Sequence, residues 1–146
     1  MAAEHTASAK WDGDLMSGSG TVSVGSGAVS GVALTWRARA EDASAGSSPE
    51  ELIAAALAGC FSMALANGLA QGGSAPAHLE TDATASFEKT DAGFRLTRIA
   101  LRVRGDVPGI DEAAFREAAE GAKAICPVSK ALDGNVEITL EAALTG

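Results

Sequence analysis

One long stretch of this chain is rich in alanine and has almost no charged residues after Glu51, and it limits the folds that the chain can adopt. Ser48 can cap a helix, Pro49 suits the first helical position, and Glu51 stands where a capping box has its acid. The pattern predicts a helix from Pro49 to about Ala70, ended by Gly72 and Gly73. Because a helix that is apolar all round belongs in a core or a subunit interface, the rest of the chain must pack around it.

Segments with the alternation of strands lie on both sides of this helix. The turn Asp12-Gly13-Asp14 between extended runs predicts a hairpin, and a third strand is expected across Val32–Arg39. After the helix, two long strands are expected at Leu79–Lys89 and Phe94–Arg104, where the apolar alternation is disturbed between Thr97 and Ala100.

The last part of the chain predicts two more helices and one strand. Asp111 can cap a helix that runs to about Ala124, a short helix begins at Pro127, and Val136–Ala142 reads as a strand. This order predicts an α+β fold with helices on one face of a mostly antiparallel sheet. Nothing in the sequence suggests a boundary, so a single domain over residues 1–146 is expected.

Composition narrows the possible partners. A chain of 146 residues can bury a core without disulfides or structural metals. Its net charge of -8 and pI near 4.6 argue against nucleic acid or an anionic membrane as a partner. The first residues do not show the basic region followed by an apolar run that is typical of a signal peptide, and no apolar stretch of membrane-spanning length is expected. A cytoplasmic location is therefore predicted.

The chain has two cysteines, Cys60 in the long predicted helix and Cys126 at the start of a short one. His5 and His78 do not stand at ligand spacing from either, so no metal site is expected. At a helix start, unpaired N–H groups favour a thiolate, whereas burial in a long helix raises the pKa of a thiol. General rules therefore favour Cys126 as the reactive thiol.

Both cysteine segments resemble the OsmC/Ohr superfamily of thiol-dependent peroxidases, and the branch of osmotically inducible protein C more than that of organic hydroperoxide resistance proteins. The segments that carry the resemblance are Ser48–Phe61, with its Pro-Glu-Glu-Leu and Cys60, the run Cys126-Pro-Val-Ser, Val107–Asp111, Asp91–Phe94 and the beginning at Trp11-Asp-Gly-Asp. The resemblance implies a cofactor-free intertwined homodimer, in which mostly antiparallel sheets pack around two long central helices and the active sites lie at the dimer interface.

The same resemblance implies that Cys60, and not Cys126, is the thiol that reacts with the peroxide. Cys60 corresponds to the peroxidatic cysteine, Cys126 to the resolving one, and Arg39 to an arginine that is oriented by Glu50 and stabilises the thiolate. Arg37 is a rival for Arg39, because two positions along a strand share a face. The implied reaction reduces an organic hydroperoxide to an alcohol through a Cys60 sulfenic acid and a Cys60–Cys126 disulfide. The resemblance implies that an external dithiol, such as one of the lipoyl type, then reduces this disulfide.

Substrate preference is predicted from the residues near Cys60. Ile53, Leu57, Phe61 and Met63 would form an apolar pocket, which favours alkyl or lipid-like hydroperoxides over hydrogen peroxide.

Two other functions stay open at this point. The chain could be a non-enzymatic, stress-related binding protein for a lipid-like ligand, or a thiol redox sensor that forms the disulfide without efficient turnover.

Overall fold

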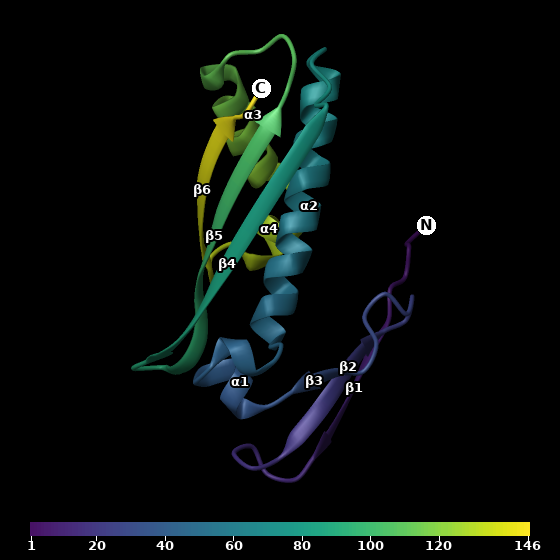
Figure 1. The fold of residues 1–146 in the computed structure, drawn as a ribbon, viewed down its shortest axis with the longest axis vertical. Helices are drawn as coiled ribbons and strands as arrows, with labels where there is room; N and C mark the ends of the chain where they lie inside the picture. The colour runs from purple at the N-terminus through teal and green to yellow at the C-terminus, as the bar shows by residue number, and fades with distance from the viewer. The chain divides into compact units, whose positions relative to one another are not determined.

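The computed structural model describes residues 1–146 (Figure 1). By its internal contacts the chain divides into two compact units, Met1–Leu52 and Ile53–Gly146, and each is described by itself. The single domain expected over the whole chain therefore stays a prediction.

The first unit contains a three-stranded antiparallel sheet in the order β1-β2-β3. Its strands are β1 (Ala7–Asp12), β2 (Ser19–Val24) and β3 (Val32–Leu34). The hairpin predicted at Asp12-Gly13-Asp14 is confirmed: Gly13 has a φ of 89°, which glycine adopts without strain.

The strand expected across Val32–Arg39 is wrong in its second half. Thr35 ends the extended run because its hydroxyl accepts a hydrogen bond from the Ala38 N–H at 3.1 Å and so caps a short helix, α1 (Trp36–Ala40). A 3₁₀ helix, η1 (Ala43–Ala45), follows. Arg37 and Arg39 consequently lie about 200° apart around a helix instead of sharing one face of a strand.

The long helix α2 (Pro49–Gln71) forms as predicted. The Ser48 hydroxyl accepts from the Glu51 N–H at 3.0 Å, which is half of a capping box. At the other end the Ser74 N–H donates to the Leu69 carbonyl at 2.9 Å across Gly73, whose φ is 88°. This closure with a left-handed glycine explains why the helix stops where it does.

The second unit contains a three-stranded sheet in the order β4-β5-β6. β4 (His78–Thr90) and β5 (Gly93–Asp106) form a long antiparallel hairpin, and β6 (Glu137–Leu144) runs parallel to β5. A β-bulge opposite Ser86 and Phe87 leaves Thr97 without a partner in the register. This extra residue is the cause of the disturbed alternation in the sequence.

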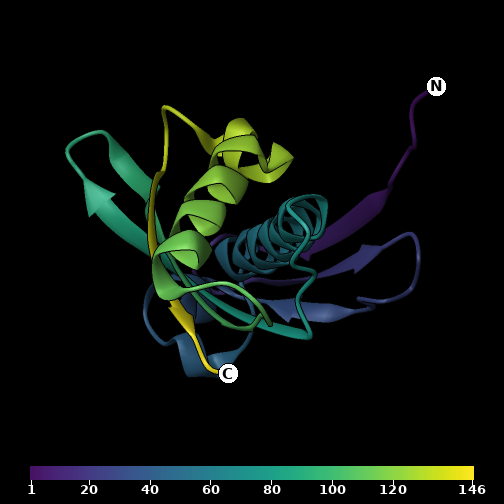
Figure 2. The ribbon, with the colours of Figure 1, turned by 90° about the horizontal axis from the view of Figure 1, so that it is seen from above.

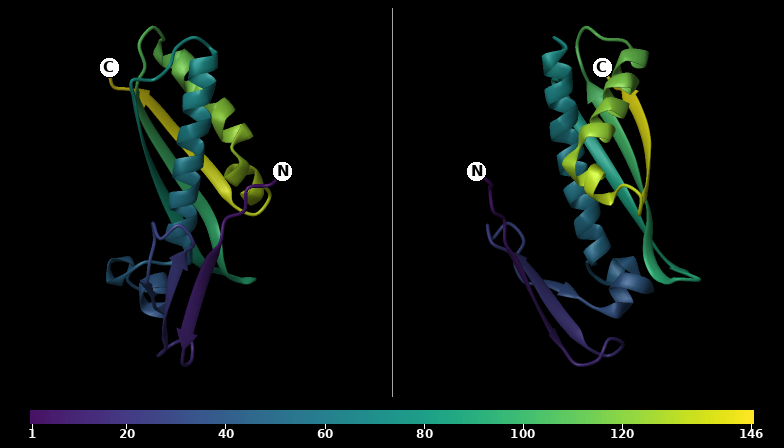
Figure 3. Two further views of the ribbon diagram at one scale, coloured as in Figure 1. Left: turned by 90° about the vertical axis from the view of Figure 1, so that its right-hand side faces the viewer. Right: turned by 180° about the vertical axis from the view of Figure 1, so that it is seen from behind.

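Two further helices complete the second unit, α3 (Glu112–Ile125) and α4 (Pro127–Leu132). Asp111 caps α3 as predicted, accepting from the Ala114 N–H at 2.8 Å. Figures 2 and 3 show α2 and α3 on the same face of the sheet, so the predicted α+β class with helices on one face is confirmed. The core between these layers consists of Leu57, Phe61, Leu65, Leu69, Ile99, Leu101, Val103, Val107, Phe115, Ala119, Ala122 and Cys126.

Helix α2 is long and apolar enough to cross a membrane, judged by length and composition only. The expectation that no segment reaches this length was therefore wrong. Leu57, Phe61 and Leu65 on one side have no exposed surface and belong to the core, whereas the Met63 side chain is 76% exposed. α2 is thus a core helix of the second unit that leaves an apolar side uncovered within a single chain.

Two glycine substitutions are expected to change the free energy of unfolding in opposite directions, one inside this core and one on the exposed side of α3. A Cβ at Gly105 would lie 2.7 Å from Phe115 Cζ and 3.0 Å from Leu79 Cδ2, whereas a Cβ at Gly121 would meet nothing within 4 Å. We expect Gly105→Ala to lower the free energy of unfolding by about 1–3 kcal/mol through overpacking. Gly121→Ala, in the exposed middle of α3, should raise it by about 0.5–1 kcal/mol. Urea unfolding measures both, and a Gly105→Ala protein as stable as the parent would contradict the packing described.

Candidate active site

The second unit brings the two cysteines into contact. Cys60 comes from the middle of α2, and Cys126 is the N-cap residue of α4, where the prediction placed it. The Cys60 thiol donates a hydrogen bond to the Cys126 sulfur, and both cysteines are free. Cys126 has no exposed surface, whereas Cys60 is half-buried.

The junction between α3 and α4 explains why Cys126 meets polar donors inside a core. Its own N–H donates to the Ala122 carbonyl and ends α3, and its carbonyl accepts from the Lys130 N–H at 3.0 Å and starts α4. Pro127 at the first helical position has no N–H to offer. The next two N–H groups, of Val128 and Ser129, belong to the first turn, which has no partners within its own helix, and both act on the Cys126 sulfur.

The environment separates the pKa values of the two thiols. Burial alone would raise the pKa of Cys126, but hydrogen bonds from the Cys60 thiol, the Ser129 N–H and hydroxyl, and the Val128 N–H lower it below the ordinary value. Burial raises the pKa of Cys60, donation to Cys126 raises it further, and the Val128 N–H opposes both. Within this unit the proton therefore stays on Cys60, and Cys126 is the thiol that ionises first.

In the first unit the structure pairs Arg39 with Glu50. Arg39 Nε lies 3.1 Å from both carboxylate oxygens of Glu50, and its Nη2 lies 2.7 Å from Oε1, a forked contact that fixes the plane of the guanidinium. Glu50 is 7% exposed. The rival Arg37 instead pairs with Asp42 at 3.0 Å on the surface. The structure thus brings together the predicted partners Arg39 and Glu50 and directs Arg37 elsewhere.

An apolar pocket of about 320 Å³ in the first unit includes this arginine in its lining. Leu15, Leu34 and Trp36 supply much of its apolar wall, and the complete lining is Trp11, Leu15, Leu34, Thr35, Trp36, Arg39 and Pro49. A pocket of this size, apolar with one charged group, suits a small ligand with an alkyl or aromatic body and one polar end. Sequence reasoning missed this pocket, because its residues come from separate strands and a helix that the sequence did not reveal.

The apolar pocket predicted near Cys60 is wrong in two of its four residues, Leu57 and Phe61. Leu57 and Phe61 have no exposed surface and are part of the core, and Ile53 packs against that core. Met63 is 76% exposed. Leu57 and Phe61 therefore do not line an open pocket in the single chain, and the roles expected of Ile53 and Met63 stay a prediction.

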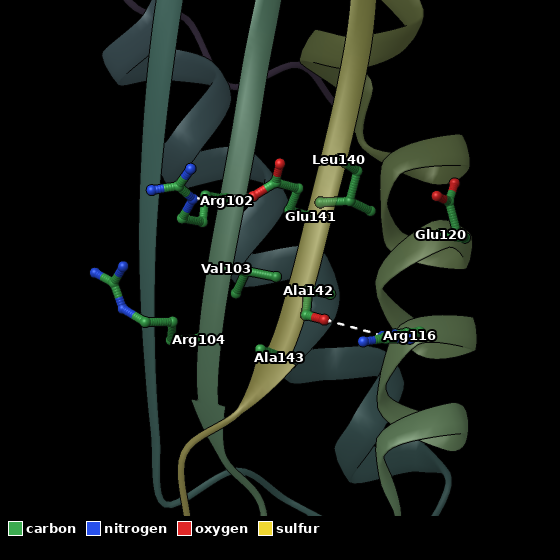
Figure 4. A pocket seen from close by; sticks show the side chains of 9 residues that line it. All are labelled: Arg102, Val103, Arg104, Arg116, Glu120, Leu140, Glu141, Ala142 and Ala143. Atoms are coloured by element: carbon green, nitrogen blue, oxygen red, sulfur yellow. Dashed lines mark hydrogen bonds and ion pairs between the residues drawn. The ribbon is translucent and has the colours of Figure 1, made fainter.

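A second hollow, of about 540 Å³, lies along β6 and the facing side of α3 (Figure 4). Three arginines line it, and Arg116 donates to the Ala142 carbonyl on the free edge of β6. Each arginine already has a carboxylate partner: Arg102 with Glu141, Arg104 with Asp82 and Glu80, and Arg116 with Glu112. The hollow has no unpaired charge and no thiol, so no chemistry is assigned to it.

The chain holds no cluster of three His, Cys, Asp or Glu side chains that could bind a metal ion.

Comparison with known proteins agrees with the fold. The family model described as OsmC-like protein matches residues 40–141. The chain is 46% identical over 133 residues to peroxiredoxin OsmC of Escherichia coli (strain K12), covering 91% of each protein. It is 32% identical over 116 residues to organic hydroperoxide resistance protein OhrA of Bacillus subtilis (strain 168), covering 77% of this chain and 78% of that protein.

Among solved structures, the organic hydroperoxide resistance protein OhrB of Bacillus subtilis matches with a TM-score of 0.72 and 26% identity, covering 94% of this chain and 97% of that one. The chain belongs to the OsmC-like family, as its sequence predicted. The higher identity to peroxiredoxin OsmC than to OhrA agrees with the predicted branch.

Proposed function

We propose that this chain is a cysteine-based peroxidase that reduces organic hydroperoxides to alcohols. The observation that carries the proposal is the contact between Cys60 and Cys126, two free thiols with opposite pKa shifts, in a chain of the OsmC-like family. The names of the relatives, a peroxiredoxin and organic hydroperoxide resistance proteins, support the reaction class.

Exposure supports Cys60 as the peroxidatic thiol. Cys126 ionises more readily but has no surface on which a peroxide could approach it, whereas Cys60 is only half-buried. In the first step the Cys60 thiolate attacks the terminal oxygen of the hydroperoxide. The O–O bond breaks, the alkoxide takes a proton and leaves as alcohol, and Cys60 becomes a sulfenic acid.

The lowered pKa of Cys126 suits it to the second step. As a thiolate it attacks the Cys60 sulfur, the S–O bond breaks, hydroxide leaves as water after taking a proton, and a Cys60–Cys126 disulfide forms. Return to the dithiol state needs two electrons from outside the chain. We assign this role to an external dithiol of the lipoyl type, which the family resemblance implies.

Arg39 is the residue that we assign to the Cys60 thiolate. Burial raises the pKa of Cys60, so reaction near neutral pH requires a nearby positive charge. The forked contact with Glu50 supports Arg39, because an oriented guanidinium can direct its remaining N–H groups at a sulfur and at the departing alkoxide.

The apolar pocket that includes Arg39 supports an organic substrate. Leu15, Leu34 and Trp36 offer contact to an alkyl or aromatic group, for which hydrogen peroxide has no counterpart. We propose that the pocket holds the organic part of the hydroperoxide and that Arg39 faces its polar end.

We further propose that the active form is a cytoplasmic homodimer. Support comes from the uncovered side of α2, which carries Ala55, Ala56, Gly59 and the largely exposed Met63 in a stretch with no charged residue from Leu52 to Gln71. An apolar helix side of this kind is stable in water when a second copy covers it.

The roles of the cysteines make the first prediction for activity. Cys60→Ser should abolish the consumption of a bulky organic hydroperoxide, because the attacking thiolate is lost. Cys126→Ser should consume about one equivalent per chain and then stop as a sulfenic acid, since no resolving thiol remains. Stopped-flow kinetics with thiol counting measure both. Full activity in Cys60→Ser would overturn the assignment, and wild-type thiols that survive excess peroxide would favour a binding protein.

The role of Arg39 predicts a change in the ionisation of Cys60. In a Cys126→Ser background, where Cys60 is the lone thiol, Arg39→Gln should raise the midpoint of the thiolate titration measured by ultraviolet absorbance. A rise of one unit lowers the thiolate fraction, and with it the rate with peroxide, about tenfold below the midpoint. Arg37→Gln is the matched control and should leave the midpoint unchanged, because Arg37 pairs with Asp42. Equal midpoints in the two variants would remove Arg39 from the mechanism.

The pocket in the first unit predicts a selective loss of affinity. Leu15→Gln should raise KM for a bulky hydroperoxide by about tenfold, because an apolar contact is replaced by a polar one, and should leave the rate with hydrogen peroxide unchanged. Met16→Gln is the control, since Met16 is the adjacent, 66% exposed apolar residue and does not line the pocket. Equal effects of both variants, or none with either, would exclude this pocket as the substrate site.

A further inference from the structure

Ser129 is a buried polar residue that the peroxidase reaction described above does not use. It is 6% exposed, lies in α4 and is third after Cys126 in the chain. Its hydroxyl is the one buried side-chain oxygen or nitrogen in the chain that has no hydrogen-bond partner. A hydroxyl left unpaired in a core lowers stability, so the presence of one beside a thiol calls for a physical reason.

The sulfur of Cys126 is the candidate acceptor for this hydroxyl, because of where the two residues stand in α4. Cys126 is the N-cap residue of α4 and Ser129 is the third helical residue, the two positions whose side chains and N–H groups meet in a capping box. Both the N–H and the hydroxyl of Ser129 lower the pKa of Cys126. A serine at this position therefore adds a second donor to the one that its backbone already provides.

The charged side chains near Cys126 have other partners or are exposed. From α3, Lys123 lies 3.2 Å from a Glu120 carboxylate oxygen and 3.5 Å from the Ile138 carbonyl of β6. On α4, Lys130 is exposed, and from α2 the titratable group is Cys60 itself. The donors that act directly on the Cys126 sulfur are the Cys60 thiol and the groups of Val128 and Ser129.

We propose that Ser129 is a positioning residue of the catalytic cycle, whose hydroxyl donates to the Cys126 sulfur and holds it as a thiolate when it attacks Cys60 and again when it leaves. The proposal rests on the proposed peroxidase function and names a residue beyond it. Without the hydroxyl, the negative charge on a sulfur with no exposed surface would lose one of its few donors.

The hydroxyl acts in two steps: in one the Cys126 sulfur is the nucleophile, and in the other it is the leaving group. In disulfide formation the Cys126 thiolate supplies the electron pair for the new S–S bond while hydroxide leaves Cys60. In reduction, a thiolate of the external dithiol attacks Cys60, the S–S bond breaks, and its electron pair returns to Cys126. The attack falls on Cys60 because Cys126 has no exposed surface, and a thiol with a lowered pKa is the faster leaving group.

A titration of the lone Cys126 thiol tests the contact without any peroxide. In the Cys60→Ser protein, Cys126 is the single cysteine, and its thiolate absorbance is followed against pH. Adding Ser129→Ala should shift the midpoint upward. An unchanged midpoint overturns the proposal, whether or not the chain is a peroxidase, because this measurement does not depend on turnover.

Matched variants separate the hydroxyl from packing. Ser129→Thr and Ser129→Val have nearly the same shape and differ in the hydroxyl, so the Thr variant should keep the low midpoint and the Val variant should lose it. Ser62→Ala is the control for loss of a hydroxyl elsewhere, because Ser62 bonds to the Ala58 carbonyl and to Thr81. It should leave the midpoint in place. Equal midpoints for Thr and Val would overturn the proposal even if Ser129→Ala failed to fold.

Kinetics in the two-cysteine protein test the role in the cycle. After one equivalent of organic hydroperoxide, Ser129→Ala should form the Cys60 sulfenic acid at the normal rate and the disulfide about tenfold more slowly near neutral pH, the effect of one lost hydrogen bond to a charged group. The disulfide rate should approach that of the parent as the pH rises above the ordinary thiol pKa. A loss that is the same at every pH would show a structural defect and overturn the proposal. If no sulfenic acid forms in the parent, the peroxidase function fails while the titration result stands.

Discussion

Burial of one side of α2 against β5 and α3 is the interaction on which the second unit depends. Leu57, Phe61 and Leu65 recur at helical spacing and have no exposed surface, and they meet Ile99 and Phe115 in one continuous core. The same packing holds Cys60 beside the junction between α3 and α4, where Cys126 lies. Because Cys126 is itself part of this core, the sulfur contact is set by hydrophobic packing and not by the weak attraction between two thiols.

That packing gives two chemically identical side chains different properties. Cys126 has no exposed surface yet receives donors from the first turn of α4, so its charged form is favoured in spite of burial. Cys60 is more exposed, but partial burial and donation to the Cys126 sulfur raise its pKa, so it keeps its proton. Cys60 is therefore the more accessible thiol and Cys126 the more readily ionised one. This division fits a cycle in which Cys60 reacts with the peroxide and Cys126 then forms the disulfide.

Much of the local structure could be predicted from the sequence. The bounds of α2 follow from Ser48, Pro49 and the glycines after Gln71, and the N-cap position of Cys126 follows from the proline after it. The strand expected through Arg39 was wrong because a single side chain, Thr35, capped a helix where the alternation continued. The parallel pairing of β6 with β5 also left no mark in the sequence, since it joins segments separated by two helices.

The sequence by itself determined most of the elements and the chemistry that they carry: a helix without charged residues after Glu51 and with a thiol at its middle, a second thiol at a helix start, and an arginine and a glutamate that precede both thiols in the chain. These follow from capping, helical spacing and residue type, which act over a few neighbouring residues. Only the tertiary structure decided that Arg39 and not Arg37 meets Glu50, that Cys126 is the fully buried thiol, and that the Ser129 hydroxyl is buried without a hydrogen-bond partner. Each of these depends on side-chain direction and burial, which packing between distant segments determines.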